Sequence, residues 1–269
     1  MYKDFIYAVT VLYLSTPLVP KVLDYLCPLN TSRPTMFPYQ VEYFLDSKVY
    51  EVPIFIHAFL ITPFPSTIIV AFDSLYANCV QHACSMFTIV GLRLKNISYH
   101  GEYMIDVKSR EEAEEKMYRI LKNCIKKHQD VLRFSRLLEI CYSQCLMVIV
   151  GINMAALSIT GLQTVIKINE LSEALRFGTY TIGQVVHLYF LSFPGQKLLD
   201  HSVEISHSVY QGQWYKIPPK SRRLFILVIM RSREPCKLTA GKMYTMSSRS
   251  FARVVKKSMS YFTVFNSMQ

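Results

Sequence analysis

The sequence is short of charged residues, and acidic residues are the scarcest of these. Asp, Glu, Lys and Arg together make up 18% of the 269 residues, against roughly 25% in a typical soluble chain. Only 19 residues are acidic while 30 are Lys or Arg, so the formal net charge is +11. Apolar residues make up 51% of the chain, and the mean hydropathy is +0.20. This balance favours a membrane protein over a soluble one.

The residue patterns that metal sites and disulfide frameworks require are also missing. The seven cysteines form no Cys-x-x-Cys pair and lie mostly inside apolar stretches, which indicates small buried side chains. Cys79, His82 and Cys84 are close in the sequence, but no second pair of ligands accompanies them. We therefore predict neither a metal site nor a bound cofactor.

No constellation of residues typical of an enzyme is found. The histidines are isolated from one another, and the sequence has neither a Ser-His-Asp arrangement nor a glycine loop for phosphate. The basic residues are strung between apolar runs rather than gathered in one patch, and no nucleic-acid recognition motif accompanies them. We therefore expect neither an enzyme nor a nucleic-acid-binding protein.

Five long apolar stretches predict an all-α, multi-pass transmembrane helix bundle that forms a single domain over residues 1–269. A helix needs roughly 20 apolar residues to cross the hydrocarbon of a bilayer. The apolar run after Asp4 has no small-residue cleavage pattern, so we expect internal membrane insertion rather than a signal peptide. The predicted spans are residues 4–26, 52–90, 134–166, 177–199 and, with a break, 221–268.

The distribution of positive charge predicts the orientation of these spans. Short loops rich in Lys and Arg stay in the cytosol, and residues 92–133 include ten of them, against two in 28–50 and two in 167–176. We therefore expect cytosolic loops at 92–133 and 200–223, an extracellular loop at 28–50 and an extracellular carboxy terminus. Asn30, in the sequon Asn30-Thr31-Ser32, is then reachable by glycosylation. A G-protein-coupled receptor ends in the cytosol, so this orientation argues against that class.

The carboxy-terminal stretch from Ser221 combines a broken apolar run with a helix of membrane length. Pro235 and Gly241 interrupt the run, and Ser247 or Ser248 offers an N-cap for the next helix. Residues 250–268 would form a helix about 28 Å long. Polar groups are costly against lipid, so its polar side faces a pore or a bundle interior, unless the helix packs on a soluble core or lies on a membrane surface. That side carries Arg253, Lys257, Ser260, Val264 and Ser267.

The same stretch carries a pattern that resembles a known family. In order and spacing it looks like the carboxy-terminal signature of insect odorant receptors, and a looser similarity extends over most of the chain. That family has seven spanning helices, so this chain resembles a member without the first two. The residues of the signature are Ser202, Tyr210, Trp214-Tyr215, Arg222-Arg223, Pro235, Leu238-Thr239-Ala240-Gly241, Ser260-Tyr261-Phe262-Thr263 and Ser267-Met268.

The resemblance implies a function, partners and site residues. Members of the family are tuning subunits of odorant-gated, nonselective cation channels, and they form hetero-tetramers with a shared odorant receptor coreceptor in the plasma membrane of olfactory sensory neurons. By position, Val264 matches the hydrophobic constriction of the pore and Ser267 the polar position one turn outward, with Ser260 on the same side of the helix. The volatile odorant binds among the outer halves of the helices, which here carry Tyr13, Thr16, Ile56, Phe59, Leu60, Thr179, Tyr180, Gly183 and Gln184.

Two other interpretations stay open at this point. A gustatory-receptor-like subunit shares the architecture, although Thr239-Ala240-Gly241 and Ser260-Tyr261-Phe262-Thr263 favour an odorant receptor, and the 92–133 loop is shorter than that of a coreceptor. A truncated, non-conducting helical membrane protein would have the same helices. Coexpression with the coreceptor separates a working channel from a silent chain.

Overall fold

The computed structural model describes residues 2–15, 25, 50–100, 110–168 and 171–267. Nearly all of these residues are helical, which confirms the predicted all-α class. The chain divides into two compact units, residues 1–75 and 76–269, and one long helix contributes to both. Each unit is held together mainly by its own contacts. The sequence predicted a single domain over residues 1–269.

The described part of the first unit contains α1 (Tyr2–Ser15), α3 (Glu51–Ile61) and the beginning of α4 (Pro63–His100). Thr62 separates α3 from α4, and its hydroxyl donates to the Ala58 carbonyl at 2.7 Å. Proline is tolerated in the first turn of a helix, where the missing N–H has no helical partner, so Pro63 is suited to begin α4. The Thr10 hydroxyl lies 3.0 Å from the Ser66 hydroxyl and joins α1 to α4.

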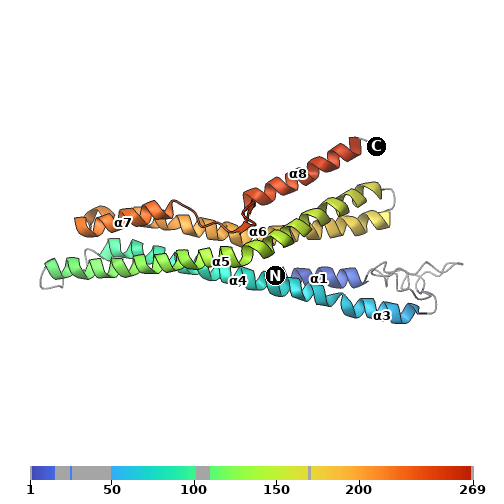
Figure 1. The fold of residues 1–269 in the computed structure, drawn as a ribbon, viewed down its shortest axis with the longest axis horizontal. Helices are drawn as coiled ribbons and strands as arrows, with labels where there is room; N and C mark the ends of the chain where they lie inside the picture. Colours follow the sequence, from blue (N-terminus) through green and yellow to red (C-terminus); the bar gives the residue numbers. More distant parts are fainter. Residues whose placement is uncertain (1, 16–24, 26–49, 101–109, 169–170, 268–269) are drawn as a thin grey trace. The chain divides into compact units, whose positions relative to one another are not determined.

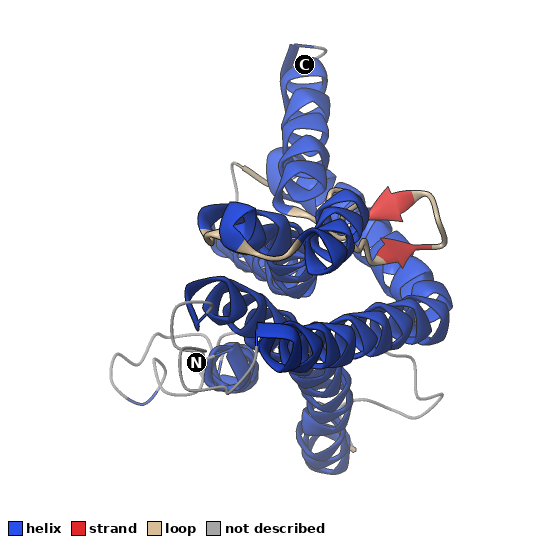
Figure 2. Cartoon of the chain, turned by 90° about the vertical axis from the view of Figure 1, so that its left-hand side faces the viewer, coloured by secondary structure: helices blue, strands red, loops and turns tan. Residues whose placement is uncertain are grey.

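The second unit begins with the rest of α4. Helices α5 and α6 pack side by side (Figure 1), and two short strands form an antiparallel hairpin (Figure 2). The elements after α4 are α5 (Arg110–Ile166), α6 (Leu171–Gln211), the short 3-10 helix η3 (Trp214–Lys216), α7 (Pro219–Ser232), β1 (Thr239–Ala240), β2 (Tyr244–Thr245) and α8 (Ser248–Ser267).

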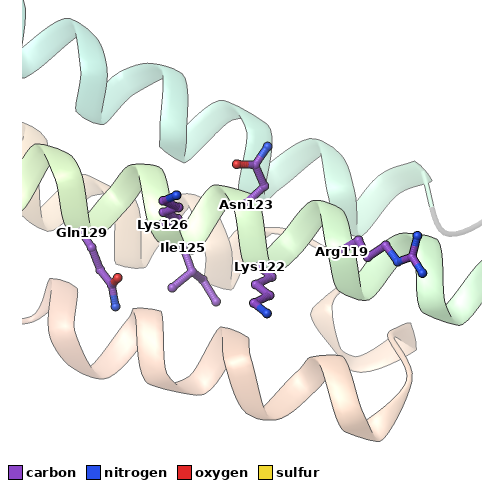
Figure 3. Close-up of a pocket in the computed structure, with 6 residues that line it drawn as sticks. All are labelled: Arg119, Lys122, Asn123, Ile125, Lys126 and Gln129. Carbon is purple, nitrogen blue, oxygen red and sulfur yellow. The ribbon is translucent and has the colours of Figure 1, made fainter.

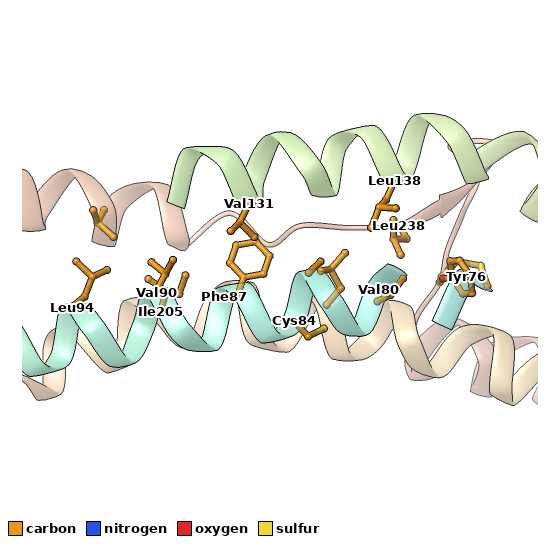
Figure 4. Close-up of a cluster of buried hydrophobic side chains, with 14 of the residues drawn as sticks. Tyr76, Val80, Cys84, Phe87, Val90, Leu94, Val131, Leu138, Ile205 and Leu238 are labelled. Carbon is orange, nitrogen blue, oxygen red and sulfur yellow. The ribbon is translucent and has the colours of Figure 1, made fainter. Parts of the chain in front are cut away.

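One apolar core holds the second unit together (Figure 4). Besides residues of α4, this core includes Val131 and Leu138 of α5, Ile205 of α6 and Leu238 before β1. Fully burying a side chain of this size contributes roughly 1.5–3 kcal/mol, so the core fixes α5, α6 and the segment before β1 relative to the second part of α4. On α4 the core residues recur every three or four positions, which is the spacing of one helix face: Tyr76, Val80, Cys84, Phe87, Val90 and Leu94.

Helix α5 is much longer than a membrane span. Its 57 residues correspond to about 86 Å, against about 30 Å of hydrocarbon in a bilayer. The amino-terminal part carries most of its charges, including an ion pair between Arg119 and Glu115 at 3.2 Å. The segment predicted as the cytosolic loop 92–133 is helical in its described part. Oppositely charged side chains one turn apart support such a solvated helix.

Two stretches of the described chain are long and apolar enough to cross a membrane, Val52–Ile97 and Glu111–Ile166. They include the predicted spans 52–90 and 134–166. Within the described residues, the predicted spans 177–199 and 221–268 are not among the stretches that combine this length and apolar composition, and residues 4–26 lie partly outside the described ranges. The arrangement of five spans therefore stays a prediction.

Candidate functional site

The pair of helices α5 and α6 encloses a polar cluster. Asn153 of α5 is buried, with 4% of its surface exposed. Its side-chain nitrogen donates to Gln184 Oε1 at 2.7 Å and lies 3.0 Å from His187 Nδ1. The second contact is a hydrogen bond when the ring proton of His187 is on Nε2. One amide nitrogen of α5 thus joins two side chains of α6, and one of these, Gln184, is a predicted odorant-binding residue.

A second polar contact lies nearer the link between the two helices. The Thr181 hydroxyl of α6 lies 3.0 Å from the Thr160 hydroxyl of α5. Each hydroxyl also lies within 3 Å of a backbone carbonyl one turn earlier, that of Phe177 for Thr181 and that of Ala156 for Thr160. Hydroxyls bonded in this way are satisfied without water. The parts of α5 and α6 next to the link between them are therefore joined by polar as well as apolar contacts.

The residues predicted to bind the odorant fall into two groups that belong to different units. In the first unit they are Tyr13, which is half-buried, and Ile56, Phe59 and Leu60, which are exposed. In the second unit they are Gly183 and Gln184, which are half-buried, and Thr179 and Tyr180, which are exposed. Thr16 and the predicted glycosylation site Asn30 lie outside the described residues. A joint pocket made by both groups stays a prediction.

Sequence reasoning missed Asn153 and His187. A signal was present for each of them. Asn153 is the only side-chain amide between residues 146 and 162, an otherwise largely apolar run, and a polar residue at membrane depth is a functional candidate by default. His187 follows Gln184 by three positions and so shares its face of the helix.

Helix α6 passes directly against the segment that leads into α8. Met246 is fully buried there, and its carbonyl oxygen and Cβ occupy the space that a β-carbon on Gly195 would need. Only glycine allows this approach. The ring of Tyr189, also on α6, packs edge to face on Phe251 of α8 with 5.5 Å between centroids. The start of α8 is therefore fitted closely to one glycine and one aromatic ring of α6.

The first turn of α8 is capped from two sides. Ser247 Oγ accepts from the backbone N–H of Ser250 at 3.3 Å, as an N-cap side chain does. The Ser248 N–H donates to Gln196 Oε1 of α6 at 3.2 Å. The first amides of a helix have no partner within it, so α8 depends on α6 for one of its terminal hydrogen bonds.

The β1–β2 hairpin lies on α5. The Gly241 N–H donates to the Ser143 carbonyl of α5 at 3.0 Å, and the Thr239 hydroxyl donates to Glu139 Oε1 at 2.9 Å. Gly241 and Lys242 both have positive φ, 59° and 61°, which is the conformation that a tight hairpin turn needs and that glycine adopts at least cost. The segment between α7 and α8 is thus bonded to α5 by its hairpin and packed on α6 at Met246.

The predicted pore residues, Ser260, Val264 and Ser267, all lie in α8. Ser260 is exposed and donates to the Lys256 carbonyl at 3.0 Å. Arg253 and Lys257 are also exposed, whereas Val254 is buried against the second unit. The side chains of residues 261–267 are outside the description, so the roles of Val264 and Ser267 stay predictions. The polar side of the described part of α8 is turned away from its own unit.

A cavity of about 630 Å³ lies along the first half of α5 (Figure 3). Three of its six lining residues are basic, and two more carry side-chain amides. None of the predicted odorant-binding residues lines it, so it does not mark the odorant site. Among the described residues no group of three or more His, Cys, Asp and Glu is placed to hold a metal ion. The cavity is lined by Arg119, Lys122, Asn123, Ile125, Lys126 and Gln129.

Known proteins with sequences similar to this chain come from one family. A family model described as 7tm Odorant receptor matches residues 4–259. Odorant receptor Or2 of Anopheles gambiae is 23% identical over 221 residues, which cover 82% of this chain and 57% of that receptor. Odorant receptor 13a of Drosophila melanogaster is 23% identical over 266 residues, which cover 93% of this chain and 62% of that receptor. The chain thus spans about three fifths of the length of these curated relatives.

The fold is also similar to that of a solved receptor. The structure of the insect olfactory receptor OR5 from Machilis hrabei in complex with eugenol matches with a TM-score of 0.69 at 13% identity, covering 99% of this chain and 65% of that one. A second structure of the same receptor gives a TM-score of 0.67 at 15% identity. At this level of identity the likeness is one of fold.

Proposed function

The chain belongs to the 7tm odorant receptor family, and we propose that it is a tuning subunit of an odorant-gated, nonselective cation channel. Its homologues are insect odorant receptors, which are membrane proteins. In the proposal, the subunit binds volatile small molecules and assembles with a shared coreceptor into a hetero-tetramer. Family membership and the likeness of fold support this proposal over a soluble helical protein.

The observation that carries the proposal is the connection of α6 to α8. Gly195 of α6 contacts the backbone of Met246, and Gln196 of α6 caps the first turn of α8. Closely packed groups cannot absorb a displacement, because protein interiors have few voids. A shift of α6 caused by a ligand would therefore reach the first turn of α8 directly.

In the proposed channel, α8 lines the pore. Its exposed polar side, with Ser260, would face the passing ions, and Val264 would form a ring with its counterparts in the other subunits. A ring of apolar side chains closes a pore by excluding water, and a small widening lets hydrated cations through. Ser267, one turn outward, would offer a hydroxyl to the ions.

The proposed odorant site lies at the outer ends of the helices. On α6 this region includes Gln184, which is bonded to Asn153. The odorant must bind the open state more tightly than the closed state, because a ligand shifts an equilibrium only by its difference in affinity. The contacts between α6 and the start of α8 would transmit the movement of α6 on odorant binding to the pore helix.

The proposed location is the plasma membrane of olfactory sensory neurons. In this orientation the carboxy terminus and the 28–50 loop with Asn30 are extracellular, and the 92–133 and 200–223 segments are cytosolic. The basic first half of α5 supports this orientation through the preference of Lys and Arg for the cytosolic side.

The experiment that tests the function is current recording from cells that express this chain together with the coreceptor. We expect a panel of volatile compounds to evoke cation currents that the coreceptor alone does not give. If none does, although surface labelling finds both subunits at the plasma membrane, the chain is a non-conducting membrane protein and the proposal is wrong. Currents that arise without the coreceptor and only with soluble tastants would instead indicate a gustatory-receptor-like subunit.

A further inference from the structure

Asn153 has a buried oxygen without a hydrogen-bond partner. Its side-chain nitrogen contacts Gln184 and His187, but among the described residues no donor reaches Asn153 Oδ1. A buried acceptor without a partner is unfavourable, and most of all at membrane depth, where water is scarce. The site therefore has an unused capacity to accept one hydrogen bond.

Exchanging the oxygen and nitrogen of the amide would replace this unused acceptor by an unused donor. With the oxygen and the nitrogen exchanged, the oxygen would take the contacts with Gln184 and His187 and the nitrogen would be left without an acceptor. The direction drawn, with the nitrogen toward Gln184 Oε1, follows from the hydrogen-bond pattern. In either direction one end of the Asn153 amide has no hydrogen-bond partner among the residues that the structure describes.

The cluster is closed on the side of α5 and open on the side of α6. Asn153 is buried, whereas Gln184 and His187 are only half-buried. From residue 176 to residue 187 of α6 every side chain is exposed or half-buried, and the first buried residue after this stretch is Leu188. A β-carbon added at Gly183, next to Gln184, would meet no heavy atom within 4 Å. A small molecule therefore has room beside the cluster.

We propose that Asn153 Oδ1 is a specificity-determining acceptor that selects ligands with a hydroxyl group. The inference rests on the proposed function and names the ligand class as small, largely apolar alcohols or phenols. The ligand hydroxyl donates to Oδ1, and its apolar part lies along the loosely packed outer half of α6. An ether of the same size cannot donate this hydrogen bond and leaves the oxygen unpaired, which disfavours its binding.

The test compares pairs of isomers in which only the alcohol can donate a hydrogen bond: n-octanol with heptyl methyl ether, and benzyl alcohol with anisole. The purified chain in lipid nanodiscs is titrated with each compound, and the dissociation constant is taken from the rise in melting temperature. We expect each alcohol to bind about 3- to 10-fold more tightly than its isomer, the effect of one neutral hydrogen bond. In Asn153→Leu we expect the two isomers to bind equally.

A matched control is Thr160→Val, which removes a polar side chain from the same helix interface outside the cluster. We expect it to keep the preference for alcohols. Equal binding of the isomers by the unmodified chain would overturn the inference, and so would a preference that survives in Asn153→Leu. Should the leucine variant not fold, Asn153→Ala takes its place.

Binding and conductance separate this inference from the proposed function. Selective binding of alcohols without any odorant-evoked current would support the subsite and overturn the channel proposal. Odorant-evoked currents that do not distinguish the isomers, together with equal binding, would overturn the subsite and leave the channel proposal standing.

Discussion

Gly195 of α6 and Met246, which precedes α8, approach so closely that a β-carbon on the glycine would overlap the methionine carbonyl oxygen. The neighbouring atom belongs to the backbone, so a rotamer change cannot relieve the overlap. The position of the segment that leads into the predicted pore helix therefore depends on the absence of a single methyl group.

We expect Gly195→Ala to destabilise the second unit by about 1–3 kcal/mol, the usual effect of overpacking a closely packed interior. The same substitution in a helix with free space stabilises by up to about 1 kcal/mol. Thermal unfolding of the purified chain, followed by its helical circular dichroism, measures the difference.

Gly151→Ala is the matched control, because a β-carbon on Gly151 would meet no heavy atom within 4 Å. It should leave the melting temperature unchanged or raise it. Equal melting temperatures for the Gly195 and Gly151 variants would show that the contact with Met246 is not tight.

A second prediction concerns the hydrogen bond from Thr239 to Glu139. Thr239→Val keeps the shape of the side chain and removes the donor, so we expect a loss of about 1.5–3 kcal/mol, typical of hydrogen bonds to charged groups. Thr239→Ser should keep most of the stability, since it retains the hydroxyl. A double-mutant cycle with Glu139→Gln isolates the pair, and a coupling energy of zero would contradict the contact.

A third prediction follows from His128, in the part of α5 before the predicted span 134–166. Burial, and to a smaller extent the charge of Arg231, lower the pKa of His128 from 6.5 to about 4. The unfolded chain therefore takes up a proton below pH 6.5 that the folded chain excludes. As the pH is lowered from 6.5 to about 4, the free energy of unfolding should therefore fall by up to about 1.4 kcal/mol per pH unit. Above pH 6.5, His128 should not change the stability.

His128→Phe removes the titrating group and keeps an aromatic ring beside Phe87, with which His128 packs edge to face at 6.3 Å between centroids. Its melting temperature should depend less on pH between neutrality and pH 5 than that of the unmodified chain. If the melting temperatures of the two proteins change with pH in the same way, His128 does not determine the pH dependence of stability between neutrality and pH 5.

A fourth prediction concerns the gate. Val264→Ser places hydroxyls at the predicted constriction and should raise the resting current several-fold in cells that also express the coreceptor, because a polar ring no longer excludes water. Val255→Ser is the control, since nine residues correspond to two and a half turns and place it on the opposite face of α8. If the resting currents of the two variants do not differ, Val264 does not form the gate.

A fifth prediction tests the orientation. An epitope tag added after Gln269 should bind antibody on intact cells, because the carboxy terminus is predicted to be extracellular. Asn30→Gln should remove any glycan that an endoglycosidase releases from the chain. If the tag is detected only after permeabilisation, the carboxy terminus is cytosolic, which contradicts the predicted orientation and the proposed pore.

The helices with regular apolar spacing were the part that the sequence predicted well. Ser247 was named as an N-cap from its type and place, and it does cap α8. The end of α6 was harder, because the polar residues 200–223 were predicted to form a cytosolic loop. Leu198, Ile205 and Val209 nevertheless remain buried at helical spacing, and the helix continues to Gln211.

The hairpin and the polar cluster could not be predicted in the same way. Strands of two residues have no periodicity to detect, so Thr239 and Gly241 were assigned to a break and to the family signature but to no hairpin. Asn153 gains its meaning from side chains of α6 more than thirty positions later. The odorant-binding residues were carried over from a resemblance, and their division between two units leaves that prediction to experiment.

The joints around α8 are made largely by main-chain atoms: the Met246 carbonyl beside Gly195, the Gly241 amide on the Ser143 carbonyl, and the Ser248 amide on Gln196. A substitution that keeps the backbone in place leaves these three contacts intact, because each of them uses a main-chain atom of this segment. In the proposed channel, the attachment of the pore helix to α5 and α6 therefore rests on backbone atoms, which substitutions in this segment leave in place.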